Sequence, residues 1–198
     1  MTKTNTLLLF LLILLSACNG GSSRGSGKDD PHRYVIKTDV PARPAGQKDV
    51  LGLVTPRLDT VRVGFIGLGM RGPGAVQRFT HIPGTKIVAL CDLHADRVEE
   101  TQTILDKAGL PRAADYSGSE EAWKKLCDRD DIDLVYIATD WKRHAEMMIY
   151  AMEQGKHVAC EVPAAMTLDE IWSVINTAEK TQKHAMQLEN CVYDFFEL

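Results

Sequence analysis

The sequence has no Cys-x-x-Cys pair. Its cysteines are Cys18, Cys91, Cys127, Cys160 and Cys191. Neither a zinc ribbon nor a thioredoxin-like redox site is therefore indicated, and no metal site is predicted. Excess positive charge is missing too. The formal net charge of -4 argues against a surface that binds nucleic acid or anionic lipid headgroups. The 198 residues, 44% hydrophobic and 25% charged, suffice for one ordinary core.

Long apolar runs are also missing, apart from a short one between Leu7 and Leu15 near the start. This run is too short to cross a bilayer comfortably. With Lys3 before it and Ser16-Ala17-Cys18 after it, the stretch 1–18 resembles a secretory signal ending in a bacterial lipobox. This interpretation predicts a lipidated Cys18 that anchors the protein to a lipid bilayer of the cell envelope, facing the periplasm or the cell surface. The alternative is an ordinary signal peptide with an incidental cysteine.

Residues 19–60 lack the apolar periodicity of a helix or strand. Gly20 to Gly27 is a Gly/Ser stretch typical of a flexible linker. Prolines then interrupt any regular period, at Pro31, Pro41, Pro44 and Pro56. We therefore expect a flexible linker and an extended segment that can lie along the folded domain, with no chemistry of its own.

A glycine-rich turn follows the apolar run Val61 to Ile66 and has the spacing Gly67-x-Gly69-x-x-Gly72. Such a strand, turn and helix can bind a dinucleotide. The first glycine permits the tight turn, the second lets the backbone approach a pyrophosphate, and the third lets helix and strand pack closely. Because the N–H groups of a helix N-terminus have no helical partners, they can bind phosphate. Alone, this spacing is a weak signal.

An acid in the expected place strengthens that interpretation. Asp92 ends the next apolar run, about twenty residues after Gly72, where a dinucleotide-binding domain holds the adenosine ribose hydroxyls. A carboxylate there favours NAD over NADP, because it would repel a 2′-phosphate. The alternative is a surface aspartate at a strand end.

Strand and helix patterns alternate from residue 61 to residue 190, which predicts a doubly wound parallel α/β sheet. The expected strands cover 61–66, 86–92, 113–116, 133–139, 157–161 and 184–188, and the expected helices cover 95–107, 120–127, 144–154 and a stretch opened by a Thr167-x-x-Glu170 capping box. Ligands of such sheets bind outside the carboxyl ends of the strands. The polar residues at those ends should therefore line one crevice with the glycine turn: Asp92, Asp140 to His144, Glu161 and Asn190.

Three stretches together resemble the Gfo/Idh/MocA group. They are Val63 to Gly72, Asp133 to His144 and Glu161-Val162-Pro163. More narrowly, the sequence is similar to the N-terminal portion of glycoside hydrolase family 109, the NAD-dependent α-N-acetylgalactosaminidases. The resemblance implies a Rossmann-type fold with NAD bound by a particular residue set: Gly67, Gly69, Met70, Arg71, Gly72, Asp92, Trp141, Lys142, Arg143, His144, Glu161, Val162 and Asn190.

One position departs from the wider group, which usually has Glu-Lys-Pro where this chain has Glu161-Val162-Pro163. Lysine there commonly assists hydride transfer from a sugar hydroxyl, whereas valine can neither take nor give a proton. The departure agrees with family 109. It counts against a simple sugar dehydrogenase.

The resemblance implies a glycosidase that is redox-neutral overall and acts on glycans ending in N-acetylgalactosamine. Bound NAD would oxidise C3 of the sugar transiently, so that C2 loses a proton, the aglycone leaves and water adds. Family members continue into a second α/β domain, so residues 191–198 are expected to begin a truncated domain, and the catalytic residues are expected beyond this chain. The alternatives are a sugar dehydrogenase of the same group and a non-catalytic NAD-binding module; a homo-oligomer is left open.

Overall fold

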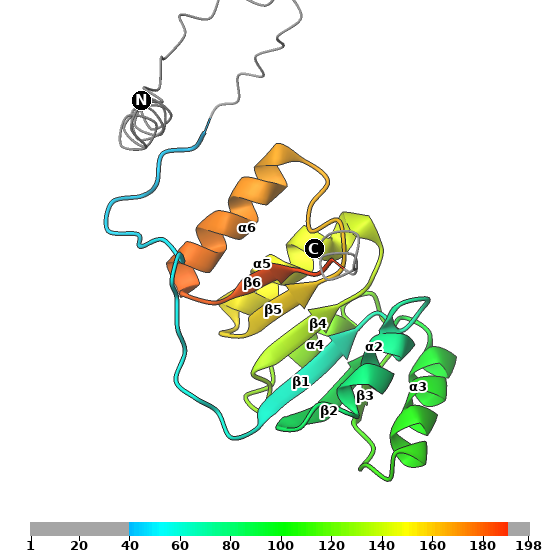
Figure 1. Cartoon of the computed structure of the whole chain (residues 1–198). Helices are drawn as coiled ribbons and strands as arrows, with labels where there is room; N and C mark the ends of the chain where they lie inside the picture. The colour runs from blue at the N-terminus through cyan, green and yellow to red at the C-terminus, as the bar shows by residue number, and fades with distance from the viewer. Residues whose placement is uncertain (1–39, 190–198) are drawn as a thin grey trace, which may run out of the picture. The chain divides into compact units, whose positions relative to one another are not determined.

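The computed structural model describes residues 40–189 and shows one six-stranded, all-parallel sheet in that part of the chain (Figure 1). The order across the sheet is β3-β2-β1-β4-β5-β6. The strands are β1 Val61–Ile66, β2 Thr85–Cys91, β3 Ala114–Tyr116, β4 Leu134–Ile137, β5 His157–Cys160 and β6 Ala185–Gln187. The helices are α2 Gly72–Phe79, α3 Ala95–Lys107, α4 Ala122–Cys127, η1 Trp141–Arg143, α5 His144–Glu153 and α6 Leu168–Thr181.

This strand order is that of a Rossmann-type doubly wound sheet, so the predicted fold class is confirmed. The predicted capping box is present at the start of α6. The Thr167 hydroxyl accepts a hydrogen bond from the Glu170 N–H at 3.2 Å, and the Glu170 carboxyl accepts one from the Thr167 N–H at 3.0 Å. Strand order reverses between β1 and β4, and at such a point the loops at the strand ends part to leave a crevice.

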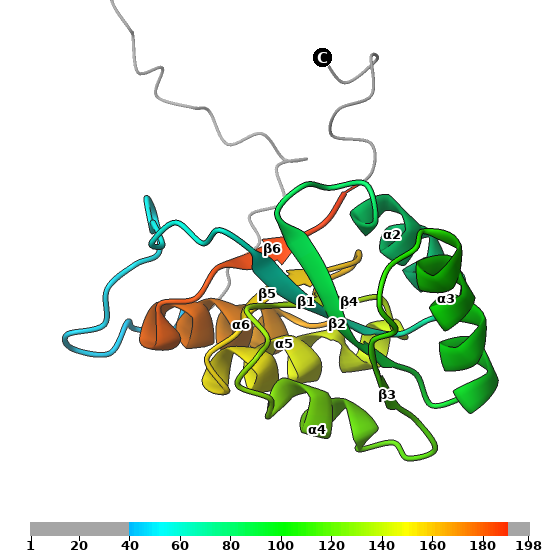
Figure 2. The same cartoon turned by 90° about the horizontal axis from the view of Figure 1, so that it is seen from below.

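Helices cover the two faces of the sheet unequally. Helices α4, α5 and α6 lie on one face, and α2 and α3 lie on the other over β1, β2 and β3 (Figures 1 and 2). Neighbouring residues of β1 supply both cores: Phe65 packs with Val76 of α2, and Ile66 packs with the α4–α6 helices. Burying one such side chain stabilises the fold by about 1.5–3 kcal/mol. The uninterrupted apolar run of β1 therefore follows from burial on both sides.

Part of the segment expected to be extended packs against α6. The Arg43 guanidinium donates two hydrogen bonds to the Glu179 carboxylate, at 2.8 and 2.7 Å, and Gln47 donates a third at 2.8 Å. Val50 packs against the core on the α6 side. The sequence shows that this stretch is neither helix nor strand, but not that its side chains bind a helix more than a hundred residues away.

Several expectations fall outside the described residues. These concern the signal and Cys18, the linker up to residue 39, Asn190, and the residues 191–198. Within residues 40–189, no helix is long and apolar enough to cross a membrane.

Candidate functional site

The glycine turn joins β1 to α2, and two of its glycines are required by the protein itself. Gly67 has a φ of +91°, and a Cβ there would lie 2.4 Å from the carbonyl oxygen of Ala138. A Cβ on Gly72 would lie 2.0 Å from the Gly67 oxygen. Both distances are far below van der Waals contact, so no side chain fits at either position.

Gly69 differs from its two neighbours. A Cβ on Gly69 would meet only the Arg97 guanidinium, at 3.5 Å, which is an ordinary contact. The protein does not need glycine here, so its small size leaves open space on the cavity side of the turn. This is the position where the sequence predicts that the backbone approaches a pyrophosphate.

Asp92 follows β2 and holds the glycine turn in place. Its carboxylate accepts hydrogen bonds from the Leu68 N–H at 2.7 Å and from the His94 N–H at 2.9 Å. The Arg97 guanidinium lies 3.6 Å from the same carboxylate. Asp92 is 7% exposed and lines the cavity described below, so it faces the ligand side while it fixes the turn.

The turn after β4 is built around Asp140, which accepts a hydrogen bond from the Lys142 N–H at 3.2 Å and so caps η1. Arg143 forms ion pairs with Glu120 at 2.8 Å and with Asp140 at 3.6 Å. These contacts fix the backbone that carries Trp141, whose side chain remains 60% exposed.

His144 begins α5 and is buried, with 1% of its surface exposed. Its Nδ1 lies 2.8 Å from the Pro163 carbonyl oxygen and its Nε2 lies 3.2 Å from the Thr139 carbonyl oxygen. A neutral imidazole has one N–H, so it donates to one of these carbonyls at a time. His144 therefore joins the turn after β4 to the turn after β5, and both of its nitrogens already face protein atoms.

Glu161 and Val162 follow β5. The Glu161 N–H donates to the Ile137 carbonyl at 2.9 Å, which continues the pairing of β4 with β5. The Tyr136 hydroxyl donates to the Glu161 carboxylate at 2.8 Å. Burial, followed by this carboxylate, raises the pKa of Tyr136, so the hydroxyl remains a donor at neutral pH.

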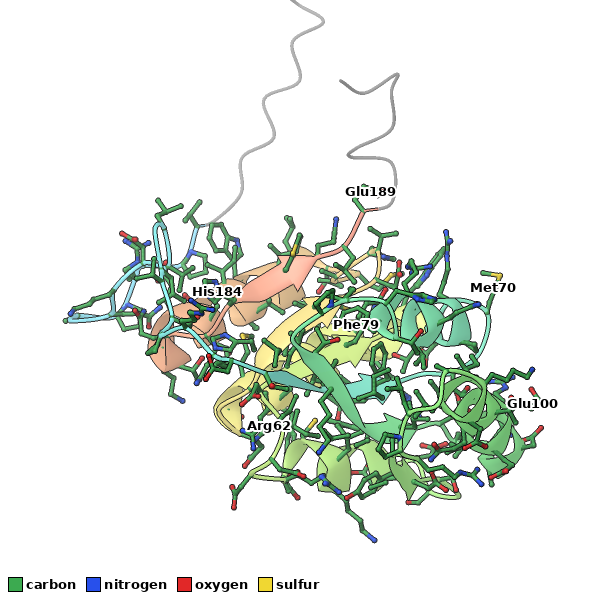
Figure 3. The ribbon with its side chains drawn as sticks, turned by 60° about the horizontal axis from the view of Figure 1, so that its bottom comes forward. Arg62, Met70, Phe79, Glu100, His184 and Glu189 are labelled. Atoms are coloured by element: carbon green, nitrogen blue, oxygen red, sulfur yellow. The ribbon has the colours of Figure 1, made fainter. Side chains whose placement is uncertain are left out.

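A cavity of about 530 Å³ brings these turns together at the carboxyl ends of the strands. Its wall includes most of the predicted residues that the structure describes: Gly67, Gly69, Met70, Arg71, Asp92, Trp141, Arg143, His144, Glu161 and Val162. Met70 is 93% exposed and extends from the turn into solvent (Figure 3). Lys142 is not part of this wall, and Gly72 is buried. The predicted contact at Asn190 lies outside the described residues.

Residues 61–188 match the Gfo/Idh/MocA family, described as an oxidoreductase family with an NAD-binding Rossmann fold. The chain belongs to the Gfo/Idh/MocA family. NAD is accordingly the cofactor of this domain, as the sequence predicts. The residues present fit such a group, because Gly69 leaves space at the turn and Asp92 directly follows the adjacent strand β2.

A glycosyl hydrolase family 109 protein of Bacteroides fragilis is 72% identical over 190 residues. The match covers 96% of this chain and 40% of that relative, so the chain spans about two fifths of the relative's length. The predicted resemblance to the N-terminal portion of family 109 is confirmed. This match supports the assignment of the chain to a glycoside hydrolase family, and so to an enzyme.

Solved structures of other proteins resemble the same part of this chain. An NAD-binding protein from Listeria innocua has a TM-score of 0.58 and 27% identity, covering 68% of this chain and 37% of that one. A myo-inositol 2-dehydrogenase from Lactobacillus plantarum has a TM-score of 0.57 and 26% identity, covering 69% and 38%.

The cavity wall also contains residues that the sequence does not predict as site residues, among them Arg97, Glu120, Trp123 and Met147. Arg97 could have been found, because it lies in the first turns of the helix that follows Asp92. Trp123 is 3% exposed and packs in the core, yet it also lines the cavity. No pattern in the sequence distinguishes a tryptophan that only packs in the core from one that also lines the cavity.

Proposed function

We propose that the protein carrying this chain is an NAD-dependent glycosidase of the α-N-acetylgalactosaminidase type. The observation that carries the proposal is the 72% identity, over 190 aligned residues that include the whole region of the cavity, with a protein named for glycosyl hydrolase family 109. Its substrate is a glycan that ends in N-acetylgalactosamine.

The chain's own residues bind and orient the cofactor in this proposal. The N–H groups at the start of α2 and the open space at Gly69 receive the pyrophosphate, and Asp92 receives the adenosine ribose. When bound, NAD supplies transient oxidation at C3 of the sugar, which makes the C2 proton acidic enough for elimination of the aglycone. The acid/base groups and the sugar contacts are assigned to the portion of the relatives that this chain does not cover.

Val162 agrees with family 109, because the wider group usually has lysine at this position. It lines the β5 end of the cavity and carries no ionisable group. Transient oxidation at C3 also releases the hydroxyl proton, so in this proposal a base from the portion that this chain does not cover removes it and later returns it. The competing candidate is a sugar dehydrogenase, which the likeness to a myo-inositol 2-dehydrogenase favours.

The two candidates differ in what they release. The gene product that contains this chain would be incubated with a chromogenic α-N-acetylgalactosaminide and NAD⁺, while phenolate release and absorbance at 340 nm are followed together. A glycosidase releases the phenolate over many turnovers with no net NADH. If NADH accumulates in proportion to the substrate consumed, the protein is a dehydrogenase and the proposal fails.

The predicted membrane anchor is a separate part of the proposal and is supported by the sequence alone. Cys18 ends a lipobox-like stretch, so the mature protein would carry acyl chains on this residue and lie in a lipid bilayer of the bacterial envelope. Labelled fatty acid should enter the wild-type protein in cells and should be lost in Cys18→Ala. Equal labelling of both proteins, or no labelling of the wild type, would exclude Cys18 as a lipid anchor.

A further inference from the structure

The cavity has a carboxylate at each of its two ends. The strand order places β2 and β5 on opposite sides of the β1–β4 pair, so Asp92 and Glu161 line opposite ends of the same cavity. In the proposed function the adenosine ribose lies at Asp92 and the pyrophosphate at the glycine turn. The nicotinamide end of the cofactor then extends toward Glu161. The inference below rests on that placement of the cofactor.

Glu161 is held at its main chain and at its side chain. Its backbone N–H donates to the Ile137 carbonyl of β4, and its carboxylate accepts a hydrogen bond from the Tyr136 hydroxyl at 2.8 Å. Two residues further on, the Pro163 carbonyl lies 2.8 Å from His144 Nδ1. Both the main chain and the carboxyl group of Glu161 are therefore fixed before any ligand binds.

Tyr136 itself is positioned by an aromatic cluster. Its ring is 5% exposed, stacks on Phe65 with centroids 5.2 Å apart, and meets Phe79 nearly edge-on at 6.0 Å. Phe79 is the last residue of α2 and lies between that helix and the sheet (Figure 3). Three packed rings leave the hydroxyl little freedom, so it stays directed at Glu161.

The neighbours of this carboxylate include the apolar Val162 and the Tyr136 hydroxyl. Burial raises the pKa of Tyr136 still further above neutral pH, so its hydroxyl stays uncharged. Arg78 of α2 is the cation that acts on the Tyr136 hydroxyl, and its side chain is exposed to solvent. Water screens an exposed cation strongly, so Arg78 offsets only part of the negative charge at the cavity wall.

We infer that Glu161, positioned by Tyr136, makes the site discriminate between the two redox forms of its cofactor in favour of NAD⁺. The oxidised nicotinamide ring carries a positive charge and the reduced ring is neutral. A carboxylate fixed at this end of the cavity attracts only the charged ring. Tyr136 is the positioning residue, and Glu161 is the residue that sets the preference.

The test measures Kd for NAD⁺ and for NADH by calorimetry with the full chain, and compares the ratio of NADH Kd to NAD⁺ Kd. Glu161→Gln keeps the acceptor for the Tyr136 hydroxyl and removes the charge. We expect it to lower the ratio about tenfold, equivalent to about 1.4 kcal/mol. Tyr136→Phe keeps the ring packing and frees the carboxylate, so it should lower the ratio about threefold.

Tyr150→Phe is the matched control. Its hydroxyl also donates to a carboxylate at 2.8 Å, that of Asp128, and its ring meets Trp123 edge-on, but Tyr150 does not line the cavity. Its ratio should equal that of the wild type. Glu161→Asp, which keeps the charge, should recover most of the preference for NAD⁺.

The outcomes separate this inference from the cofactor placement itself. If the wild-type chain binds neither form, the placement fails and the inference fails with it. If both forms bind and Glu161→Gln weakens them equally, Glu161 touches a part of the cofactor common to both and the inference alone is overturned. If Glu161→Gln is poorly folded, the ratio of Tyr136→Phe decides: an unchanged value overturns the inference.

Discussion

The two ends of the cavity are built in different ways. At the β2 end, the Asp92 carboxylate accepts hydrogen bonds from two backbone N–H groups, those of Leu68 and His94. At the β5 end, Glu161 is held by the Tyr136 hydroxyl, and the turn beyond it is held by the His144 imidazole. One end thus depends on main-chain groups that every sequence supplies, and the other depends on particular side chains elsewhere in the chain.

This difference explains why one end can be found in the sequence more easily than the other. A motif with fixed spacing is enough to place Asp92, because the backbone that binds it belongs to the motif. A side-chain partner such as Tyr136 lies 25 residues from Glu161 on another strand, so only the pairing of β4 with β5 reveals it. Substitutions at both ends test this difference.

Gly67→Ala should have the largest effect. Its φ of +91° is strained for alanine, and its Cβ would meet the Ala138 backbone at 2.4 Å. We expect a loss of more than about 3 kcal/mol in the free energy of unfolding, measured in urea, and no NAD binding.

Gly109→Ala is the control for this prediction. Gly109 has a φ of +68°, but a Cβ at this position would meet nothing within 4 Å. It should lose only about 1 kcal/mol, from backbone strain alone. Equal losses at both positions would show that the close approach to β4 costs nothing.

His144→Ala should come next and tests the β5 end. It removes a buried ring and leaves the Pro163 and Thr139 carbonyls without their partner. We expect a loss of about 2–4 kcal/mol in unfolding free energy, together with weaker NAD binding. His81→Ala, at an exposed position, serves as the control and should change neither quantity. An unchanged stability in His144→Ala would refute its role as a link between the two turns.

Asp92→Asn should lower both the stability and the NAD affinity, each by a moderate amount. The amide oxygen can still accept one backbone N–H, so the turn loses about 1–2 kcal/mol at most. NAD⁺ and NADH should both bind about tenfold more weakly, because the ribose contact is common to them. A change confined to one redox form would contradict the assignment of this end to the adenosine ribose.

Arg43→Met should have the smallest effect. It removes the ion pair between Arg43 and Glu179, which lie 136 positions apart in the sequence. The Arg43 hydrogen bond holds the pKa of Glu179 below its usual value. A carboxyl whose pKa is lowered by folding stabilises the protein above the unfolded pKa and loses that contribution as the pH falls.

The wild type should therefore lose part of its thermal stability as the pH falls below the ordinary glutamate pKa of 4.5, and Arg43→Met should lose less over the same window. Arg57→Met, in the same extended segment, is the control and should keep the wild-type pH profile. Parallel profiles for Arg43→Met and the wild type would mean that the ion pair adds no stability in solution.

Much of the fold could be predicted from the sequence. The uninterrupted apolar runs at Val61–Ile66 and Leu134–Ile137 indicate strands buried on both faces, and the alternation with helices indicates a parallel sheet. Strand ends were less certain. The strand expected over 133–139 covers only Leu134–Ile137, because the sheet pairing stops where β1 turns at Gly67.

The site was predicted in its residues more than in its geometry. Asp92, Glu161 and the glycine turn do meet at one cavity, as the strand-end argument requires. Lys142 does not, because η1 turns its side chain into solvent while its backbone N–H binds the Asp140 carboxylate. A run of four adjacent residues cannot all face the same way, and the sequence alone does not say which one points outward.

Local chemistry makes several features readable in the sequence: the glycine turn, the acid after β2, the capping box of α6 and the strand–helix alternation. These follow from backbone sterics and from the period of apolar residues, both of which act over a few neighbouring positions. Three contacts become visible only in the folded chain: Tyr136 holds Glu161, His144 links two turns, and Arg43 binds Glu179. Such side-chain partners meet only after strand pairing and packing bring distant parts of the chain together.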